Sequence, residues 1–171
     1  MELKSNEEKI TRALLVSVDT GEYDAQASLD ELFELVKSAG ADPVLSVTQN
    51  LQKIEKGTFV GTGKLAEIAE ICESQEIDLL VFDSELSPTQ IKNIEAETDV
   101  RVIDRTTLIL DIFAQRARSK EGKLQVELAQ LKYMLPRLTG KGIAMSRLGG
   151  GIGTRAVSYT HLRAHETRSN L

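Results

Sequence analysis

The chain of 171 residues can form one ordinary hydrophobic core with an extension, since domains commonly hold about 100 to 150 residues. It is 41% hydrophobic and 27% charged, and no apolar run approaches the roughly 20 residues of a membrane span, so we expect no membrane partner. Residues 1–104 carry 9 Lys/Arg and 22 Asp/Glu, whereas residues 105–155 carry 10 and 3, a division that favours a polyphosphate partner such as nucleic acid.

Residues 1–104 predict an N-terminal α/β domain. Four short β-rich runs, each nearly continuous in apolar residues, are typical of strands buried on both faces of a parallel sheet. The runs are residues 13–18, 44–47, 79–82 and 100–103. Helical patterns separate them, so this alternation predicts a small, mostly parallel, three-layer α/β sandwich.

Each of the three segments between the strands has apolar residues at the spacing of an amphipathic helix. These residues are Leu29, Leu32, Phe33 and Val36 in the first segment, Leu65, Ile68, Ala69 and Cys72 in the second, and Ile91 and Ile94 in the third. Gly40 supplies a stop signal after the first helix. The third helix is expected to begin with Ser87 as N-cap, Pro88 at the first position and Gln90 closing a capping box.

Residues 105–139 predict a long helical arm of coiled-coil type. Its apolar residues alternate in steps of four and three, the spacing of a coiled-coil seam, with an interruption at Glu121 beside Gly122. The seam positions are Leu110, Ala114, Ala117, Glu121, Leu124, Leu128, Leu131, Leu135 and Leu138. A helix with this stripe requires a partner along it, and we expect Pro136 to end or kink the helix.

Residues 140–155 follow as a glycine-rich basic loop, and residues 156–171 show no pattern related to what precedes them. The last segment is similar to peptide read from adapter DNA joined to a truncated gene, so we expect it to lie outside the fold. His161 and His165 stand four residues apart, as metal ligands on a helix do. Leu162 occupies the place where a zincin motif needs glutamate, so no metal site is predicted.

Two Gly-Lys pairs invite comparison with a phosphate-binding loop. In the segment 61–64, Thr58 stands where a P-loop needs its first glycine, and Leu65 replaces the Ser/Thr that would hold Mg²⁺. The pair at 140–141 fails in the same way. A tight turn into a helix is the simpler interpretation of residues 61–64, with anion binding as the alternative. We predict no nucleotide hydrolysis and no bound cofactor for this chain by itself.

Asp19 and Asp83 follow the first and third predicted strands, at the sheet edge where ligands usually bind. Two carboxylates there suit Mg²⁺, as in a phosphoacceptor receiver domain. A receiver also needs a second acid, where Thr20 stands, and a lysine after a fifth strand, which is missing. A stand-alone phosphoacceptor or small-ligand-binding domain is therefore the alternative function, and helix caps or solvated acids are the simpler interpretation.

The basic residues after residue 105 are interspersed with few acids, namely Asp111, Glu121 and Glu127. Lysines and arginines often do no more than solvate a helix, but such a face normally carries acids as well. The pattern favours a phosphate-contacting surface with steep salt dependence and little sequence preference. The glycines of the loop allow its backbone to enter a narrow crevice near phosphates or bases.

Cys72 is the single cysteine, so it cannot form an internal disulfide, and its apolar helical neighbours indicate a packed core thiol. The start of the chain is polar and acidic, without the apolar region of a secretory signal. Together these features predict a cytoplasmic protein.

Several segments, taken in order, resemble the HflX family of ribosome-associated GTPases. They are residues 59–64, 82–90, 104–106 with 112–114, 125–131 and 146–155. The family's pattern continues after Arg155 with Gly-Pro-Gly-Glu-Thr, where this chain has Ala156-Val157-Ser158.

The resemblance implies that the chain is the N-terminal ribosome-binding part of an HflX-like GTPase with a role in ribosome splitting, rescue or translation. In such a protein the α/β domain is followed by two long antiparallel helices joined by the glycine-rich loop, and then by a GTPase domain that binds GTP and Mg²⁺. The implied partners are the large (50S) ribosomal subunit and its RNA, together with the missing partner helix and the GTPase domain of the same protein. This chain would then have no catalytic residue and no activity of its own.

The basic pattern and the resemblance together nominate a set of residues for contact with ribosomal RNA. In the loop they are Lys141, Arg147, Gly149, Gly150, Gly151, Gly153 and Arg155, and in the arm they are Arg116, Arg118, Lys120 and Lys123.

Overall fold

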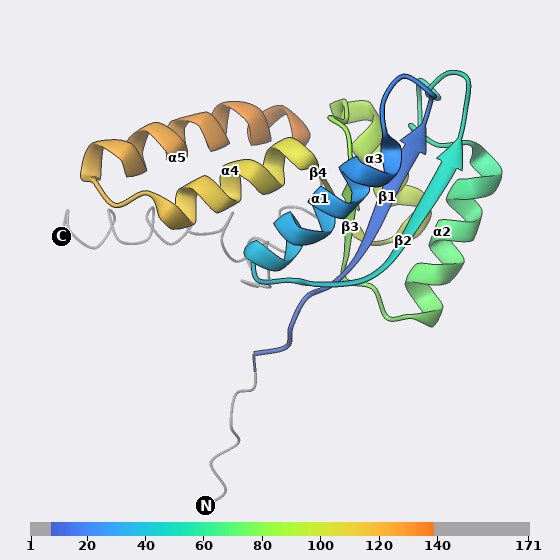
Figure 1. The fold of residues 1–171 in the computed structure, drawn as a ribbon, viewed down its shortest axis with the longest axis horizontal. Coiled ribbons are helices and arrows are strands. Elements are labelled where there is room, and N and C mark those ends of the chain that lie inside the picture. Colours follow the sequence, from blue (N-terminus) through green and yellow to red (C-terminus); the bar gives the residue numbers. More distant parts are fainter. Residues whose placement is uncertain (1–7, 139–171) are drawn as a thin grey trace, which may run out of the picture.

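The structure, a computed structural model, describes residues 8–138. Four parallel strands form one sheet in the order β2-β1-β3-β4 (Figure 1). The strands are β1 (Arg12–Asp19), β2 (Asp42–Asn50), β3 (Leu79–Phe82) and β4 (Arg101–Asp104). The helices are α1 (Ala25–Ser38), α2 (Thr62–Ser74), α3 (Pro88–Thr98), α4 (Arg105–Arg116) and α5 (Lys120–Met134), followed by a short 3-10 helix, η1 (Leu135–Arg137).

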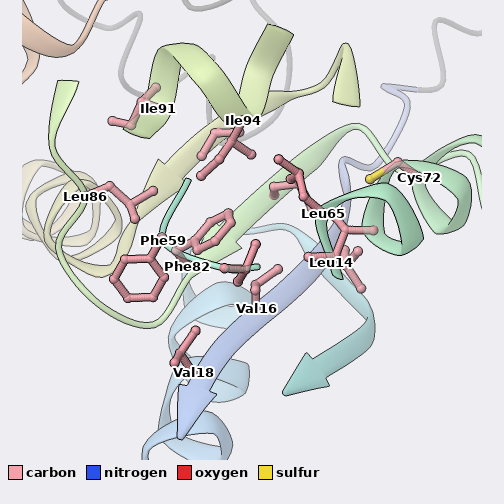
Figure 2. Close-up of a cluster of buried hydrophobic side chains, with 14 of the residues drawn as sticks. Leu14, Val16, Val18, Phe59, Leu65, Cys72, Phe82, Leu86, Ile91 and Ile94 are labelled. Carbon is pink, nitrogen blue, oxygen red and sulfur yellow. The ribbon is translucent and has the colours of Figure 1, made fainter. Parts of the chain in front are cut away.

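Helices cover both faces of the sheet, which confirms the predicted three-layer α/β sandwich. On one face, α2 and α3 pack over alternate residues of β1 and β3, including Leu14, Val16 and Phe82 (Figure 2). On the other face, α1 and α4 pack over the intervening residues, such as Leu15 and Val81. The alternation follows from strand geometry, because successive side chains point to opposite faces.

Strand β2 departs from the expectation of a strand buried on both faces. It lies at the edge of the sheet, pairs with β1 and extends beyond the predicted run at both ends. Pro43 is its single buried residue, the residues from Val44 to Asn50 are half-buried or exposed, and Leu45 is 43% exposed. A short apolar run in the sequence does not tell an edge strand from a central one, because both are rich in β-branched residues.

The predicted helix signals at Gly40 and Ser87 are confirmed. Gly40 follows the C-cap of α1 with a positive φ of 92°, a conformation that glycine adopts without strain. The Ser87 hydroxyl accepts from the Gln90 backbone N–H at 3.1 Å, and the Gln90 side chain accepts from the Ser87 N–H at 2.9 Å. This capping box and Pro88 fix the start of α3 at the predicted residue.

The arm is helical, as predicted, but it is divided at residues 117–119, a few positions before the interruption of the seam expected at Glu121 beside Gly122. Ala117 adopts an extended backbone conformation after α4, and Ser119 caps α5 by accepting from the Gly122 N–H at 2.9 Å. A serine that bonds the next turn's backbone competes with helix continuation, so the chain reverses here. Helices α4 and α5 therefore lie side by side as a hairpin (Figure 1). As predicted, α5 ends immediately before the turn that contains Pro136.

The outer side of α5 keeps an uncovered apolar face, which we call the leucine face: Leu124, Leu128 and Leu135 are 58%, 53% and 61% exposed. Within α5, the single buried residue is Gln130. None of the helices between residues 8 and 138 is both long and apolar enough to cross a membrane.

Candidate nucleic-acid interface

Four of the predicted RNA-contacting residues surround the turn between α4 and α5. Arg116 ends α4, Arg118 lies in the connection, and Lys120 and Lys123 lie in the first turns of α5. All four side chains are exposed, and the turn is the end of the hairpin that points away from the sheet (Figure 1). We call these four residues the basic tip.

The position of the lysines argues that they are not there to stabilise α5. The N-terminus of a helix carries a partial positive charge, so cations in its first turn are unfavourable and anions favourable. Lys120 occupies the first position of α5, and Glu121 is the acid of that turn. Arg116 has a simpler explanation, since a cation in the last turn of α4 interacts favourably with the helix dipole. The lysines thus favour a role toward an external anion.

The remaining nominated residues lie outside the residues that the structure describes. They are Lys141, Arg147, Gly149, Gly150, Gly151, Gly153 and Arg155. The same holds for His161 and His165. Their predicted roles stay predictions.

A polar cluster with buried carboxylates at Asp83 and Asp104 connects the base of the hairpin to the sheet. We call it the polar joint and define it as loop 83–87 with Asp104, Arg105, Tyr133 and Arg137. Asp104 is fully buried at the end of β4 and caps α4 by accepting from the Thr107 N–H at 3.0 Å. Its second oxygen accepts from the Leu86 N–H at 3.0 Å and from the Tyr133 hydroxyl at 2.6 Å.

Arg105, next in sequence, bonds to α1 and to the residue that follows β3. Its guanidinium donates to the Asp83 carboxylate at 2.6 Å, to the Ser28 carbonyl at 2.8 Å and to Glu31 at 3.0 Å. The Asp83 side chain is only 1% exposed, so this ion pair is largely removed from water. One arginine therefore ties α4, α1 and the end of β3 together.

Arg137 completes the joint beyond α5. Its side chain donates to the Leu86 carbonyl at 3.1 Å and to Glu85 at 3.3 Å, and its guanidinium stacks 3.8 Å from the centre of the Tyr133 ring. Burial and the hydrogen bond to Asp104 raise the pKa of Tyr133 above its usual range. The Tyr133 phenol therefore remains a hydrogen-bond donor at all physiological pH values.

The joint was not predicted from the sequence, although the segments 82–90 and 104–106 that contain much of it were singled out as family-like. Capping signals are local, and Asp104 before a helix is a signal that sequence reasoning can use. The partners Tyr133 and Arg137 are 29 and 51 residues away from Asp104 and Leu86, respectively, and no local pattern indicates them.

The structure gives no support to the phosphoacceptor alternative. Asp83 is paired with Arg105, and Asp19 accepts from the Gly21 N–H at 2.9 Å as a turn cap. Between residues 8 and 138, no three His, Cys, Asp or Glu side chains gather as a metal site would require. Both carboxylates thus have structural contacts, although Asp83 is a buried partner of an ion pair and not the helix cap or solvated acid that the simpler interpretation predicted.

The segment 61–64 forms a turn into α2, as predicted. The Gly61 N–H donates to the Gln49 side chain at 2.9 Å, and Lys64 pairs with Glu67 of the same helix at 3.3 Å. A P-loop would instead turn its amides and its lysine toward phosphates. These residues therefore do not fit GTP or its Mg²⁺, and we assign no chemistry with that nucleotide to them.

Comparison with known proteins identifies the family. A family model described as "GTP-binding GTPase N-terminal" matches residues 26–114, and one described as "GTP-binding GTPase Middle Region" matches residues 116–169. The second match includes most of the segment 156–171 that sequence analysis set apart, and the origin of that segment stays a prediction.

The chain is similar to proteins named GTPase HflX. It is 50% identical over 155 residues to the one from Alkalihalophilus pseudofirmus and 44% identical over 151 residues to the one from Escherichia coli. These matches cover 90% and 88% of this chain but 37% and 35% of the relatives, so the chain spans little more than a third of their length.

Solved structures of GTP-binding proteins share the fold. A GTP-binding protein from Sulfolobus solfataricus in complex with GDP is 26% identical, with a TM-score of 0.57 over 94% of this chain and 46% of that protein. A structure described as the SsGBP mutation variant G235P is 30% identical, with a TM-score of 0.59 over 74% of this chain and 41% of its own. The chain therefore belongs to the HflX family of GTPases and corresponds to the N-terminal part of its members.

Proposed function

We propose that this chain is the RNA-binding N-terminal part of an HflX GTPase, which associates with the large ribosomal subunit in the cytoplasm and takes part in ribosome splitting, rescue or translation. The observation that carries the proposal is the basic tip. Four exposed cations stand at the far end of a hairpin whose base is anchored on a domain with strong negative charge. The acidic domain is repelled by phosphates, so an RNA surface is approached tip first.

The predicted loop adds Lys141, Arg147 and Arg155, which follow in the sequence after Arg137 at the base of the hairpin. Glycines between them suit a narrow RNA crevice. We propose this loop as a further RNA contact in addition to the basic tip.

GTP binding with Mg²⁺ and GTP hydrolysis belong, in this proposal, to the part of the relatives that this chain does not match. The support is twofold: the Gly61–Lys64 turn has its amide and lysine engaged within the domain, and the chain matches little more than a third of its relatives. The chain by itself is then a binding module without catalysis.

Co-sedimentation with purified large subunits over a salt series tests the proposal. Neutralised phosphates release counterions, so the logarithm of the association constant should fall linearly with the logarithm of the salt concentration. The Lys120→Ala/Lys123→Ala variant should bind about tenfold more weakly, and its salt slope should be smaller by about 1.4 to 1.8 because two phosphate contacts are lost.

Lys53→Ala/Lys56→Ala is the matched control. These two lysines are also exposed and differ by three positions, but they lie on the acidic domain between β2 and α2. The control should bind as the wild type does. Equal losses in both variants would mean that net charge, and not the tip, decides binding, and that result would overturn the proposal.

A further inference from the structure

We propose that the polar joint fixes the direction of the hairpin relative to the sheet, with Asp104, Arg105, Tyr133 and Arg137 as positioning residues for the basic tip. The inference rests on the proposed function for its consequence, since the direction of the hairpin decides whether the basic tip reaches the RNA ahead of the acidic domain. The mechanical part of the inference stands on the geometry of the joint alone.

Both legs of the hairpin end on the same five-residue loop. Arg105, the first residue of α4, holds Asp83 at the start of loop 83–87, and Arg137, just after α5, holds the Leu86 carbonyl near its end. A hairpin anchored at one leg can swing about that point. Anchoring both legs to one short segment removes this freedom.

Asp104 makes the two anchors depend on each other. A single carboxylate oxygen, Oδ2, accepts from the Leu86 N–H and from the Tyr133 hydroxyl, so the loop and α5 share one acceptor. Asp104 is fully buried, and hydrogen bonds to a buried carboxylate are short and strong. A tilt of α5 that withdraws Tyr133 leaves part of a buried charge without its donor, which is strongly unfavourable.

Apolar packing of α5 does not provide this constraint. Gln130 is its single buried residue, and two of its leucines, Leu124 and Leu128, face solvent. A helix held by little buried apolar surface takes its position from its polar contacts. The hydroxyl of Tyr133 and the guanidinium of Arg137 are therefore the groups to alter.

Two conservative variants test the joint, each with a matched control. Tyr133→Phe removes the hydroxyl and keeps the ring that stacks on Arg137, and Arg137→Lys keeps the charge but not the fork of donors. The controls make the same chemical changes away from the joint. Tyr23→Phe removes a hydroxyl that donates to the Val18 carbonyl at 2.8 Å, and Arg12→Lys alters a side chain that donates to the Gln75 carbonyl at 3.1 Å.

The first measurement needs no partner. Spin labels on Glu73→Cys in α2 and Glu121→Cys in α5 report the distance between domain and tip by double electron–electron resonance; both positions are exposed, and buried Cys72 stays unlabelled. The Tyr133→Phe/Arg137→Lys variant should give a distinctly broader distance distribution than the wild type. The Tyr23→Phe/Arg12→Lys control should match the wild type.

The second measurement is affinity for the large subunit over the same salt series as above. The joint variant should bind about tenfold more weakly, and its salt slope should be unchanged because all tip cations remain. An unchanged distance distribution would overturn the joint, whatever the affinity. A broadened distribution with wild-type affinity would overturn the positioning role. If the wild-type chain fails to bind subunits at all, the proposed function fails, and the distance measurement still decides whether the joint fixes the hairpin.

Discussion

Asp83 is a buried carboxylate that depends on one cation. Its Oδ1 atom pairs with Arg105, while its buried Oδ2 atom has no hydrogen-bond partner within residues 8–138. We predict that Arg105→Gln lowers the free energy of unfolding by about 3 to 5 kcal/mol, because removing one partner leaves an uncompensated buried charge. Urea denaturation of the full chain measures this loss.

Two further variants serve as controls for the loss of stability expected in Arg105→Gln. The exposed Arg116→Gln should change the free energy of unfolding by less than about 0.5 kcal/mol. The double variant Asp83→Asn/Arg105→Gln should recover part of the loss, since no buried charge remains. If Arg105→Gln proves as mild as Arg116→Gln, the ion pair does not stabilise the fold.

We predict that the buried thiol of Cys72 makes the free energy of unfolding decrease as the pH rises. Burial raises the pKa of its thiol from 9.0 to about 11, so the folded chain keeps this proton where the unfolded chain loses it. The free energy of unfolding should therefore fall between pH 9 and 11 more steeply in the wild type than in Cys72→Ala, while below pH 9 the difference between the two proteins should be constant. Urea midpoints at a series of pH values compare them, and parallel curves between pH 9 and 11 would contradict the prediction.

Among the elements, α5 exposes the leucine face to solvent. Covering a leucine side chain is worth about 1.5 to 3 kcal/mol, so uncovered leucines in a row promote association. We predict that the chain self-associates as its concentration rises, and that Leu124→Gln/Leu128→Gln weakens this association. Sedimentation velocity over a concentration series measures it, with Lys132→Gln, an exposed change on the same helix, as the control.

A sedimentation coefficient independent of concentration would contradict the leucine-face prediction, and so would equal behaviour of the leucine variant and the control. The first result would mean that the leucine face does not mediate self-association, and the second would mean that another surface does.

The elements also show what local signals can and cannot predict. The start of α3 followed from Ser87, Pro88 and Gln90, because a capping box acts within one turn. The break at Ala117–Ser119 was missed, since leucine spacing alone is the same for one helix and for two that are stacked. The serine N-cap at Ser119, three residues before Gly122, was the signal that could have revealed it.

For the whole molecule, the layer order was predictable because buried parallel strands alternating with amphipathic helices have few arrangements. The polar joint was not predictable, because Asp104, Tyr133 and Arg137 meet only after the hairpin has folded back on the sheet. The difference in charge between residues 1–104 and residues 105–155 could be predicted from their composition. Its spatial meaning, with cations at the far end of the hairpin, required the break between α4 and α5.

Cross-linking can show directly whether the basic tip or the acidic domain contacts RNA. A photo-cross-linking p-benzoylphenylalanine placed at Gln125, exposed in α5 near the basic tip, should cross-link to RNA of purified large subunits. The same residue placed at Glu73, exposed in α2 of the acidic domain, should not. Cross-links from position 73 without any from position 125 would show that the acidic domain contacts the partner and would contradict the account.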